Sequence, residues 1–191
     1  MAALCIREAV AGDAEGIARV QVEGWNRAYR SFIPDCLPAS YSLERRHEEW
    51  RQRLAESPGG KLHLVAVEAG QVLAICSGGP PLRDEMVVEG DVDSYTAQVY
   101  GLYVMPERYG EGIGGRLLGD LAVRLAALGH ANLCLWAFVR NPFRGFYEKL
   151  GGRTLARAEW RVGGVTVEEM AYGWPEIAEL IQACSAEGKT E

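Results

Sequence analysis

The sequence predicts one α/β (α+β) domain, with a mixed and mostly antiparallel central sheet and flanking helices. In the middle of the chain a strand-like run, a glycine-rich turn, a helix and a wholly apolar run follow one another, which is the order of a central βαβ unit. Pairs of apolar runs joined by short glycine turns flank this unit and predict hairpins. At 191 residues the chain is long enough for one core and too short to expect two.

The N-terminal part is expected to form a strand and then two helices. Residues 4–10 predict the strand, and Asp13 is placed to act as the N-cap of the first helix. The apolar positions on one face of that helix are Ile17, Ala18, Val22, Trp25 and Tyr29. Ser42 is placed to cap the second helix. Its apolar face would consist of Leu43, His47, Trp50 and Leu54.

The middle of the chain holds a hairpin, a loop and the βαβ unit. Strands at 62–68 and 72–77 form the hairpin, and the polar residues 78–93 predict an exposed loop. A strand at 97–104 leads through the glycine turn into a helix at about 112–128. The core positions of that helix are Ile113, Leu117, Leu121 and Leu125.

The C-terminal part continues the sheet. The apolar run at 133–139 predicts a strand buried on both faces in a parallel pairing. A short helix at 142–150 and a hairpin of strands at 153–162 and 165–173 come next. We expect one domain at 1–174, followed at 175–191 by a C-terminal helix and a polar tail.

Composition restricts the classes of function. The formal net charge of −6 disfavours nucleic acid as a partner, and no apolar run approaches the roughly 18 residues that a membrane span needs. The N-terminus lacks the apolar stretch of a signal peptide, so we expect a cytoplasmic protein. Residues 108–144 hold five arginines against two acids, and this local positive charge suggests one anionic ligand.

The turn between the central strand and helix has the composition of an anion site. Four of its residues are glycines (Gly110, Gly112, Gly114 and Gly115). Glycines let consecutive N–H groups converge, and the helix N-terminus adds partial positive charge. A phosphate or pyrophosphate is therefore the expected ligand. The turn also matches GxGxxG, but no acid that could hold a ribose follows between Leu121 and Tyr147, and the turn lacks the Gly-Lys-Ser/Thr of a Walker loop.

Two motifs in this order resemble the GNAT superfamily of N-acetyltransferases. The first is the strand end at 102–107 with the glycines and Ile113 at 110–114, and the second is Asn141 to Gly151. The resemblance extends from Ile6 to Tyr172. It implies acetyl-CoA as co-substrate, no metal, and a homodimer as the family habit. The implied contacts with acetyl-CoA are Leu102, Tyr103, Val104, Tyr109, Gly110, Glu111, Gly112, Ile113, Gly114, Gly115 and Asn141.

The same resemblance implies how the reaction would run. Tyr147 would be the general acid that protonates the departing thiolate. A main-chain N–H near Leu102–Val104 would stabilise the oxyanion, and the acetyl group would pass directly to a primary amine of a small molecule or peptide. Trp25, Tyr29 and Gln98 are candidate substrate contacts. The alternative is an acetyl-CoA-binding sensor or interaction module without turnover.

Three positions depart from the family pattern. Tyr109 stands where Arg or Gln is usual, and Glu111 stands where a basic residue is frequent, so weaker CoA binding is expected. Gln98 occupies the place of a frequent catalytic Glu and cannot accept the proton of an amine. The open alternatives for the base are a water chain, a neutral amine that needs no base, or one of Glu23, Glu85, Glu89, Asp91 and Asp93.

Overall fold

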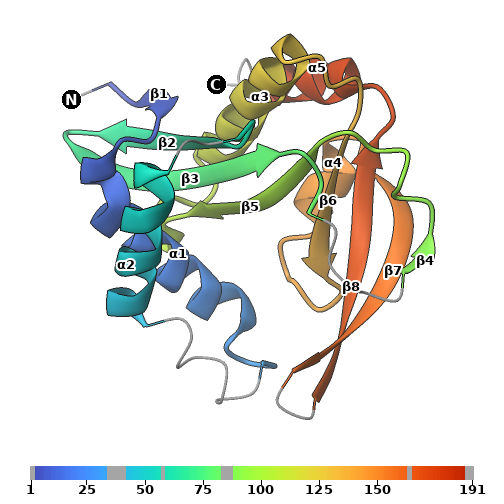
Figure 1. The fold of residues 1–191 in the computed structure, drawn as a ribbon, viewed down its shortest axis with the longest axis horizontal. Helices are drawn as coiled ribbons and strands as arrows, with labels where there is room; N and C mark the ends of the chain where they lie inside the picture. The colour runs from blue at the N-terminus through green and yellow to red at the C-terminus, as the bar shows by residue number, and fades with distance from the viewer. Residues whose placement is uncertain (1–2, 34–41, 57–58, 83–87, 163–164, 188–191) are drawn as a thin grey trace.

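The computed structural model describes residues 3–33, 42–56, 59–82, 88–162 and 165–187, and their strands form one sheet in the order β1-β2-β3-β5-β6-β8-β7-β4 (Figure 1). The strands are β1 (Cys5–Glu8), β2 (Leu62–Glu68), β3 (Gln71–Gly79), β4 (Val88–Gly90), β5 (Gln98–Val104), β6 (Leu133–Phe138), β7 (Arg153–Val162) and β8 (Val165–Trp174). Neighbouring strands are antiparallel except β5 and β6. The predicted mixed sheet and its central βαβ unit are confirmed.

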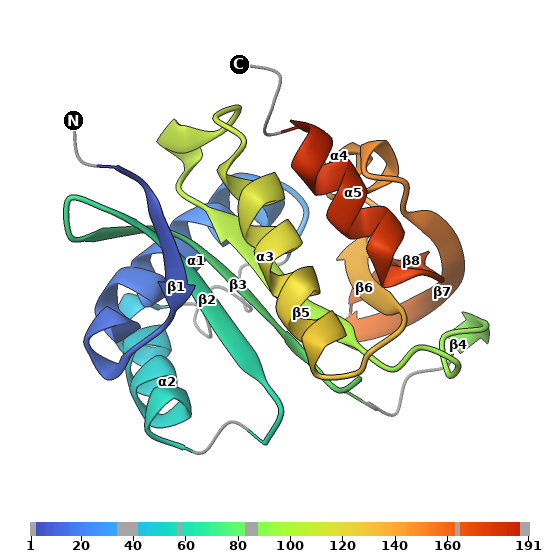
Figure 2. The ribbon, with the colours of Figure 1, turned by 90° about the horizontal axis from the view of Figure 1, so that it is seen from above.

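The helices lie on both faces of the sheet. They are α1 (Ala14–Tyr29), α2 (Leu43–Ala55), α3 (Ile113–Ala127), α4 (Gly145–Lys149) and α5 (Ile177–Glu187), with 3-10 turns η1 (Ala11–Asp13) and η3 (Pro106–Arg108). One face carries α1 and α2, and the other carries α3 with α5 beside it (Figures 1 and 2). No helix in the described parts of the chain combines the length and the apolar character that crossing a membrane requires.

The largest core cluster lies under α3. Its predicted core positions are confirmed, because Ile113 is 2% exposed and Leu117, Leu121 and Leu125 are fully buried. They pack on strands of both halves of the sheet and on α5, whose Leu180 is also fully buried. The helix that opens with the glycine turn is therefore held rigidly over the centre of the sheet.

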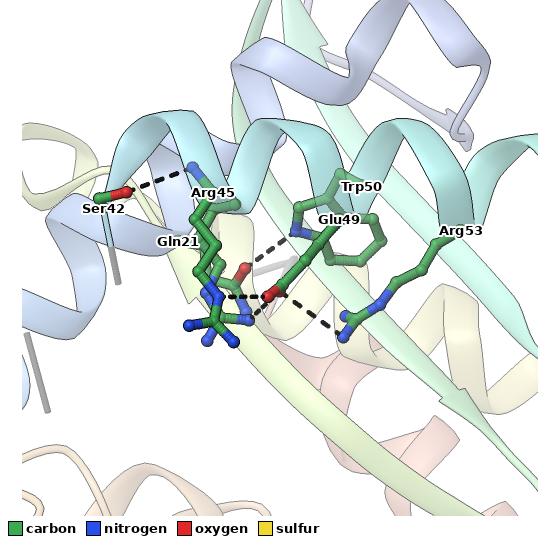
Figure 3. Close-up of polar contacts among 7 residues, drawn as sticks. Gln21, Ser42, Arg45, Glu49, Trp50 and Arg53 are labelled. Carbon is green, nitrogen blue, oxygen red and sulfur yellow. Dashed lines mark hydrogen bonds and ion pairs between the residues drawn. The ribbon is translucent and has the colours of Figure 1, made fainter. Parts of the chain in front are cut away.

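Helix α2 begins where the sequence predicted. Ser42 Oγ accepts a hydrogen bond of 3.2 Å from the N–H of Arg45 (Figure 3). Trp50 is buried and donates from Nε1 to Gln21 Oε1 of α1 at 2.9 Å, which anchors the helix pair. The predicted apolar face is only partly correct, because Leu43 is exposed at the first turn of the helix.

Two local predictions were wrong because residues of other elements pair with the residues concerned. Asp13 precedes α1 but makes no side-chain cap; its carboxylate accepts from Arg7 at 2.6 and 2.9 Å and from the N–H of Val10. Residues 78–93 are not a plain loop. Gly78 and Gly79 extend β3, and Val88–Gly90 forms β4, which pairs with β7.

Strands β5 and β6 pair only over two residues. The partners are Gln98 with Cys134 and Val99 with Leu135. Just beyond, Ser77 of β3 pairs with Gly101 and Gly78 pairs with Val99, so Tyr100 is the extra residue of a β-bulge in β5. A bulge bends its strand, and β5 and β6 separate from this point on. The separation leaves one edge of β5 open, and the candidate active site lies along this edge.

Candidate active site

The separation leaves one edge of β5 open. The N–H of Met105 bonds to the carbonyl of Leu73 in β3 at 2.8 Å. Main-chain groups of successive strand residues point to opposite edges, so Tyr103 also faces β3, whereas Leu102 and Val104 face the side of β6. Among the described residues no strand pairs with β5 there. An extended, peptide-like molecule could therefore bond to Leu102 and Val104 as an added strand.

The glycine turn follows at the end of this edge. Gly110 has φ 87° and Gly112 has φ 70°, which is the left-handed region that residues with a Cβ rarely adopt. The first helical hydrogen bond of α3 runs from the N–H of Arg116 to the carbonyl of Gly112. The N–H groups before Arg116 have no acceptor within the helix, and they are the groups that bind an anion.

A cavity of about 1040 Å³ joins the open edge to the glycine turn. Every candidate contact for acetyl-CoA lines it, and so do Tyr147 and Tyr29. Further lining residues were not among the predicted contacts. They include Gly24 and Ala28 of α1, Phe143 before α4 and Phe146 in it, and Ile181, Cys184 and Ser185 of α5. Phe143 lies inside a recognised motif, but no local signal pointed to α5.

Tyr147 projects from α4 and is half-buried. Burial raises the pKa of its phenol above that of free tyrosine, so the hydroxyl stays protonated at neutral pH. Two residues of β8 hold α4 in place. Tyr172 donates from its hydroxyl to Glu148 at 2.9 Å, and Trp174 donates from Nε1 to the carbonyl of Leu150 at 2.8 Å. The phenol is thus a fixed hydrogen-bond donor at the wall of the cavity.

Asn141 links the two sides of the cavity. It is buried, and its Nδ2 donates to the hydroxyl of Tyr29 on α1 at 3.0 Å. Its Oδ1 accepts from the N–H of Phe143 at 2.9 Å, which shapes the segment leading into α4. Asn141 therefore positions both Tyr29 and the entry to α4.

The charges at the glycine turn are already paired. Arg108 donates from Nε to both carboxylate oxygens of Glu111 at 2.8 Å, and from NH1 to Glu68 of β2 at 2.9 Å. These hydrogen bonds lower the pKa of Glu111 and raise that of Arg108. Arg108 therefore offsets part of the negative charge of Glu111, which the sequence placed beside the phosphate site.

Two candidate substrate residues lie outside the cavity lining. Trp25 is 7% exposed and packs edge-on against Tyr29 and Phe138, so it serves the core. Gln98 lies at the start of β5, where its Oε1 accepts from the N–H of Leu82 at 3.0 Å. Both were separated from the site by packing that the sequence does not show.

None of the proposed bases whose side chains the structure describes lines the cavity. Glu111 and Asp120 are the carboxylates among the described lining residues, and both lie on the side of α3. Of the candidate bases, Glu23, Asp91 and Asp93 are exposed outside the lining. Glu85 lies outside the described residues, as does the side chain of Glu89. Among the described residues no three His, Cys, Asp or Glu gather as metal ligands would.

Known proteins resemble this chain in sequence and fold. The model of the FR47-like protein family matches residues 82–161. The uncharacterized N-acetyltransferase YuaI of Bacillus subtilis (strain 168) is 26% identical over 175 residues, which cover 92% of this chain and 95% of that protein.

Solved structures agree with this sequence match. A Desulfovibrio desulfuricans protein assigned to the GNAT family has a TM-score of 0.66 at 22% identity, covering 92% of this chain and 99% of its own. YncA of Salmonella typhimurium, solved with its cofactor acetyl-CoA, has a TM-score of 0.64 at 20% identity, covering 92% and 94%.

The fold and these matches define the protein as an acyltransferase. Within that class the chain is similar in fold to a structure of the GNAT family and in sequence to an N-acetyltransferase, which agrees with the resemblance seen in its motifs.

Proposed function

We propose that the protein transfers the acetyl group of acetyl-CoA directly to a primary amine of a small molecule or peptide in the cytoplasm. The observation that carries this proposal is the cavity where the open edge of β5, the glycine turn and Tyr147 meet. The described residues fit acetyl-CoA, because Leu102 and Val104 offer main-chain partners to a peptide-like arm and the turn offers N–H groups to a pyrophosphate. YncA, solved with acetyl-CoA, shares the fold.

Each residue has a role in this proposal. Acetyl-CoA, when bound, supplies a thioester whose carbonyl carbon an uncharged amine can attack. A main-chain N–H at the open edge of β5 donates to the carbonyl oxygen as negative charge develops there. Asn141 holds the entry to α4, and Tyr29 borders the acceptor side of the cavity.

Tyr147 assists the departure of the thiolate. The C–N bond forms, the C–S bond breaks, and the phenolic proton passes to sulfur, while the amine gives up its own proton to water. Because burial raises the pKa of Tyr147, a free phenolate is disfavoured, and proton transfer accompanies C–S cleavage rather than preceding it. The phenol then regains a proton from water.

Replacing Tyr147 by Phe tests this role. We expect kcat for thiol release to fall about 100-fold or more, with the Kd for acetyl-CoA changed less than about twofold. Tyr100→Phe is the matched control, because the hydroxyl of Tyr100 bonds to the carbonyl of Pro80 and Tyr100 does not line the cavity. Unchanged turnover in Tyr147→Phe would remove Tyr147 from the mechanism.

The sensor alternative makes a different prediction for the unaltered protein. A sensor would bind acetyl-CoA and release no thiol with any amine in a panel of amino acids, polyamines and peptides. Thiol release above the uncatalysed rate with one amine, together with the mass of the acetylated product, would exclude it.

A further inference from the structure

Two aromatic side chains meet at the rim of the cavity. Tyr109 follows η3 at the start of the glycine turn, and Phe143 lies between β6 and α4. Their ring centroids are 5.1 Å apart with the planes at 69°. Both line the cavity, yet Tyr109 is 37% and Phe143 is 39% exposed. They therefore lie where the cavity opens to solvent, and they bridge its two sides.

This pair is not explained by the core. Neither ring belongs to the hydrophobic clusters formed by the described residues. An edge-to-face contact contributes only about 0.5–1.5 kcal/mol, and two large rings left in water forgo the larger benefit of burial. Exposed aromatic surface at the rim of a cavity is typical of a binding site.

The position of Tyr109 indicates which part of a ligand would meet the rings. Tyr109 directly precedes Gly110, the first glycine of the anion-binding turn, so its side chain lies beside whatever is attached to a bound pyrophosphate. The arm of CoA would run inward along Leu102 and Val104 toward Tyr147. The other substituent of the pyrophosphate is the adenosine, and it must leave through the rim.

The chemistry of the rings suits a base rather than a phosphate. An aromatic face offers no hydrogen-bond donor to an anion, but it stacks well on a purine. Tyr109 and Phe143 present such aromatic faces at the rim, where both rings are partly exposed.

We propose that Tyr109 and Phe143 form an adenine subsite, in which the purine ring of CoA stacks against the aromatic pair. The subsite rests on the proposed function, since it assumes that CoA occupies the cavity. It makes binding depend on the adenosine and not only on the pantetheine arm and the pyrophosphate.

The test compares two ligands by isothermal titration. CoA carries the adenosine, and 4′-phosphopantetheine lacks it. We expect Phe143→Ala and Tyr109→Ala each to weaken CoA binding about tenfold, because a stacked base contributes about 1–3 kcal/mol. The Kd for 4′-phosphopantetheine should change less than twofold in either variant. Phe143→Trp, which keeps an aromatic face, should retain CoA binding.

A second readout follows the base itself. The fluorescence of 1,N6-etheno-CoA should be quenched when it binds the unaltered protein, and this quenching should be lost in Phe143→Ala at saturating ligand. Leu82→Ala is the control, because Leu82 is 46% exposed and does not line the cavity.

Two outcomes would overturn the subsite. Equal weakening of both ligands would show that the rings act on the arm or on the shape of the turn. Unchanged CoA binding in both alanine variants would show that the rings do not contact the base. Failure of the proposed function looks different, because the unaltered protein would then fail to bind CoA at all. Both rings are exposed, so the variants should keep the thermal stability of the parent.

Discussion

Gly112→Ala should weaken CoA binding while hardly changing the stability of the fold. Gly129→Ala should lower the stability and leave CoA binding unchanged. Both glycines have positive φ, 70° at Gly112 and 93° at Gly129, and they stand at opposite ends of α3. A Cβ added at either position meets no atom within 4 Å, so no steric clash contributes. The pair therefore isolates the cost of a left-handed backbone for alanine, which is roughly 1–2 kcal/mol.

The two sites differ in what fixes the left-handed backbone conformation. At Gly129 the end of α3 requires this conformation, because the N–H of Gly129 bonds to the carbonyl of Ala126 and that of His130 bonds to the carbonyl of Leu125. The cost then appears as lost stability, a fall in Tm of about 2–8 °C for a domain of this size. At Gly112 the neighbouring Gly110 can absorb a change of φ, so alanine relaxes in the free protein.

That relaxation transfers the cost to binding. Residue 112 must return to the left-handed region before the N–H groups of the turn can face a pyrophosphate, so the Kd for CoA should rise about 5- to 30-fold. Isothermal titration gives the Kd for CoA of each variant, and thermal unfolding gives the Tm of each. A Gly112→Ala variant that binds CoA like the parent would refute the reasoning, as would a Gly129→Ala variant that loses the same affinity.

Two further predictions concern paired charges. Arg108→Gln leaves the carboxylate of Glu111 unpaired beside the turn, so isothermal titration should show roughly two- to fivefold weaker CoA binding. Adding Glu111→Gln to this variant should restore the affinity for CoA. No restoration would mean that Arg108 contacts the phosphates itself. Hydrogen bonds from Arg7 lower the pKa of Asp13, so this pair stabilises the fold above about pH 4 and the effect disappears as pH falls through the lower, folded-state pKa. Asp13→Asn should therefore lower Tm by a few degrees at pH 7 and by less near pH 2.5, whereas equal losses at both pH values would contradict the assignment.

The sequence predicted those elements whose signal is local. The apolar register of α3 repeats every four residues over most of its length, and both strands of the last hairpin are long runs joined by two glycines. Strand β4 could not be predicted in this way. Its three residues carry too little pattern, and its partner in β7 lies more than 60 residues further along the chain. Asp13 likewise had the composition of a cap, but Arg7, six residues earlier in β1, competed for its carboxylate.

In the candidate site, too, the sequence predicted residues that stand in local motifs and missed contacts between remote elements. The glycine turn and Asn141 stand in motifs that can be read along the chain, and they line one cavity. The contact of Asn141 with Tyr29 joins positions 112 residues apart, and the approach of α5 depends on the packing of two helices. Gln98 occupied a suggestive position in β5, but the bulge at Tyr100 and the loop after β3 place it away from the cavity.

Two of the five arginines in residues 108–144 pair with acids in the folded protein. Arg108 pairs with acids of β2 and of the turn, and Arg124 pairs with Glu8 of β1 and Asp120 of its own helix. Acids from strands remote in sequence thus meet the arginines of this segment. What the turn offers to an anion is mainly its directed N–H groups, whose orientation depends on Gly110 and Gly112.

A phosphate site made of main-chain groups places little demand on the side chains around it. Under the proposed function, this is why a tyrosine and a glutamate can stand at positions where basic residues are frequent. Glu111 is paired with Arg108, and the N–H of Tyr109 bonds to the carbonyl of Pro106 while its ring lies at the rim beside Phe143. The departures from the family pattern then change which part of CoA the side chains contact, and they leave the pyrophosphate to the backbone.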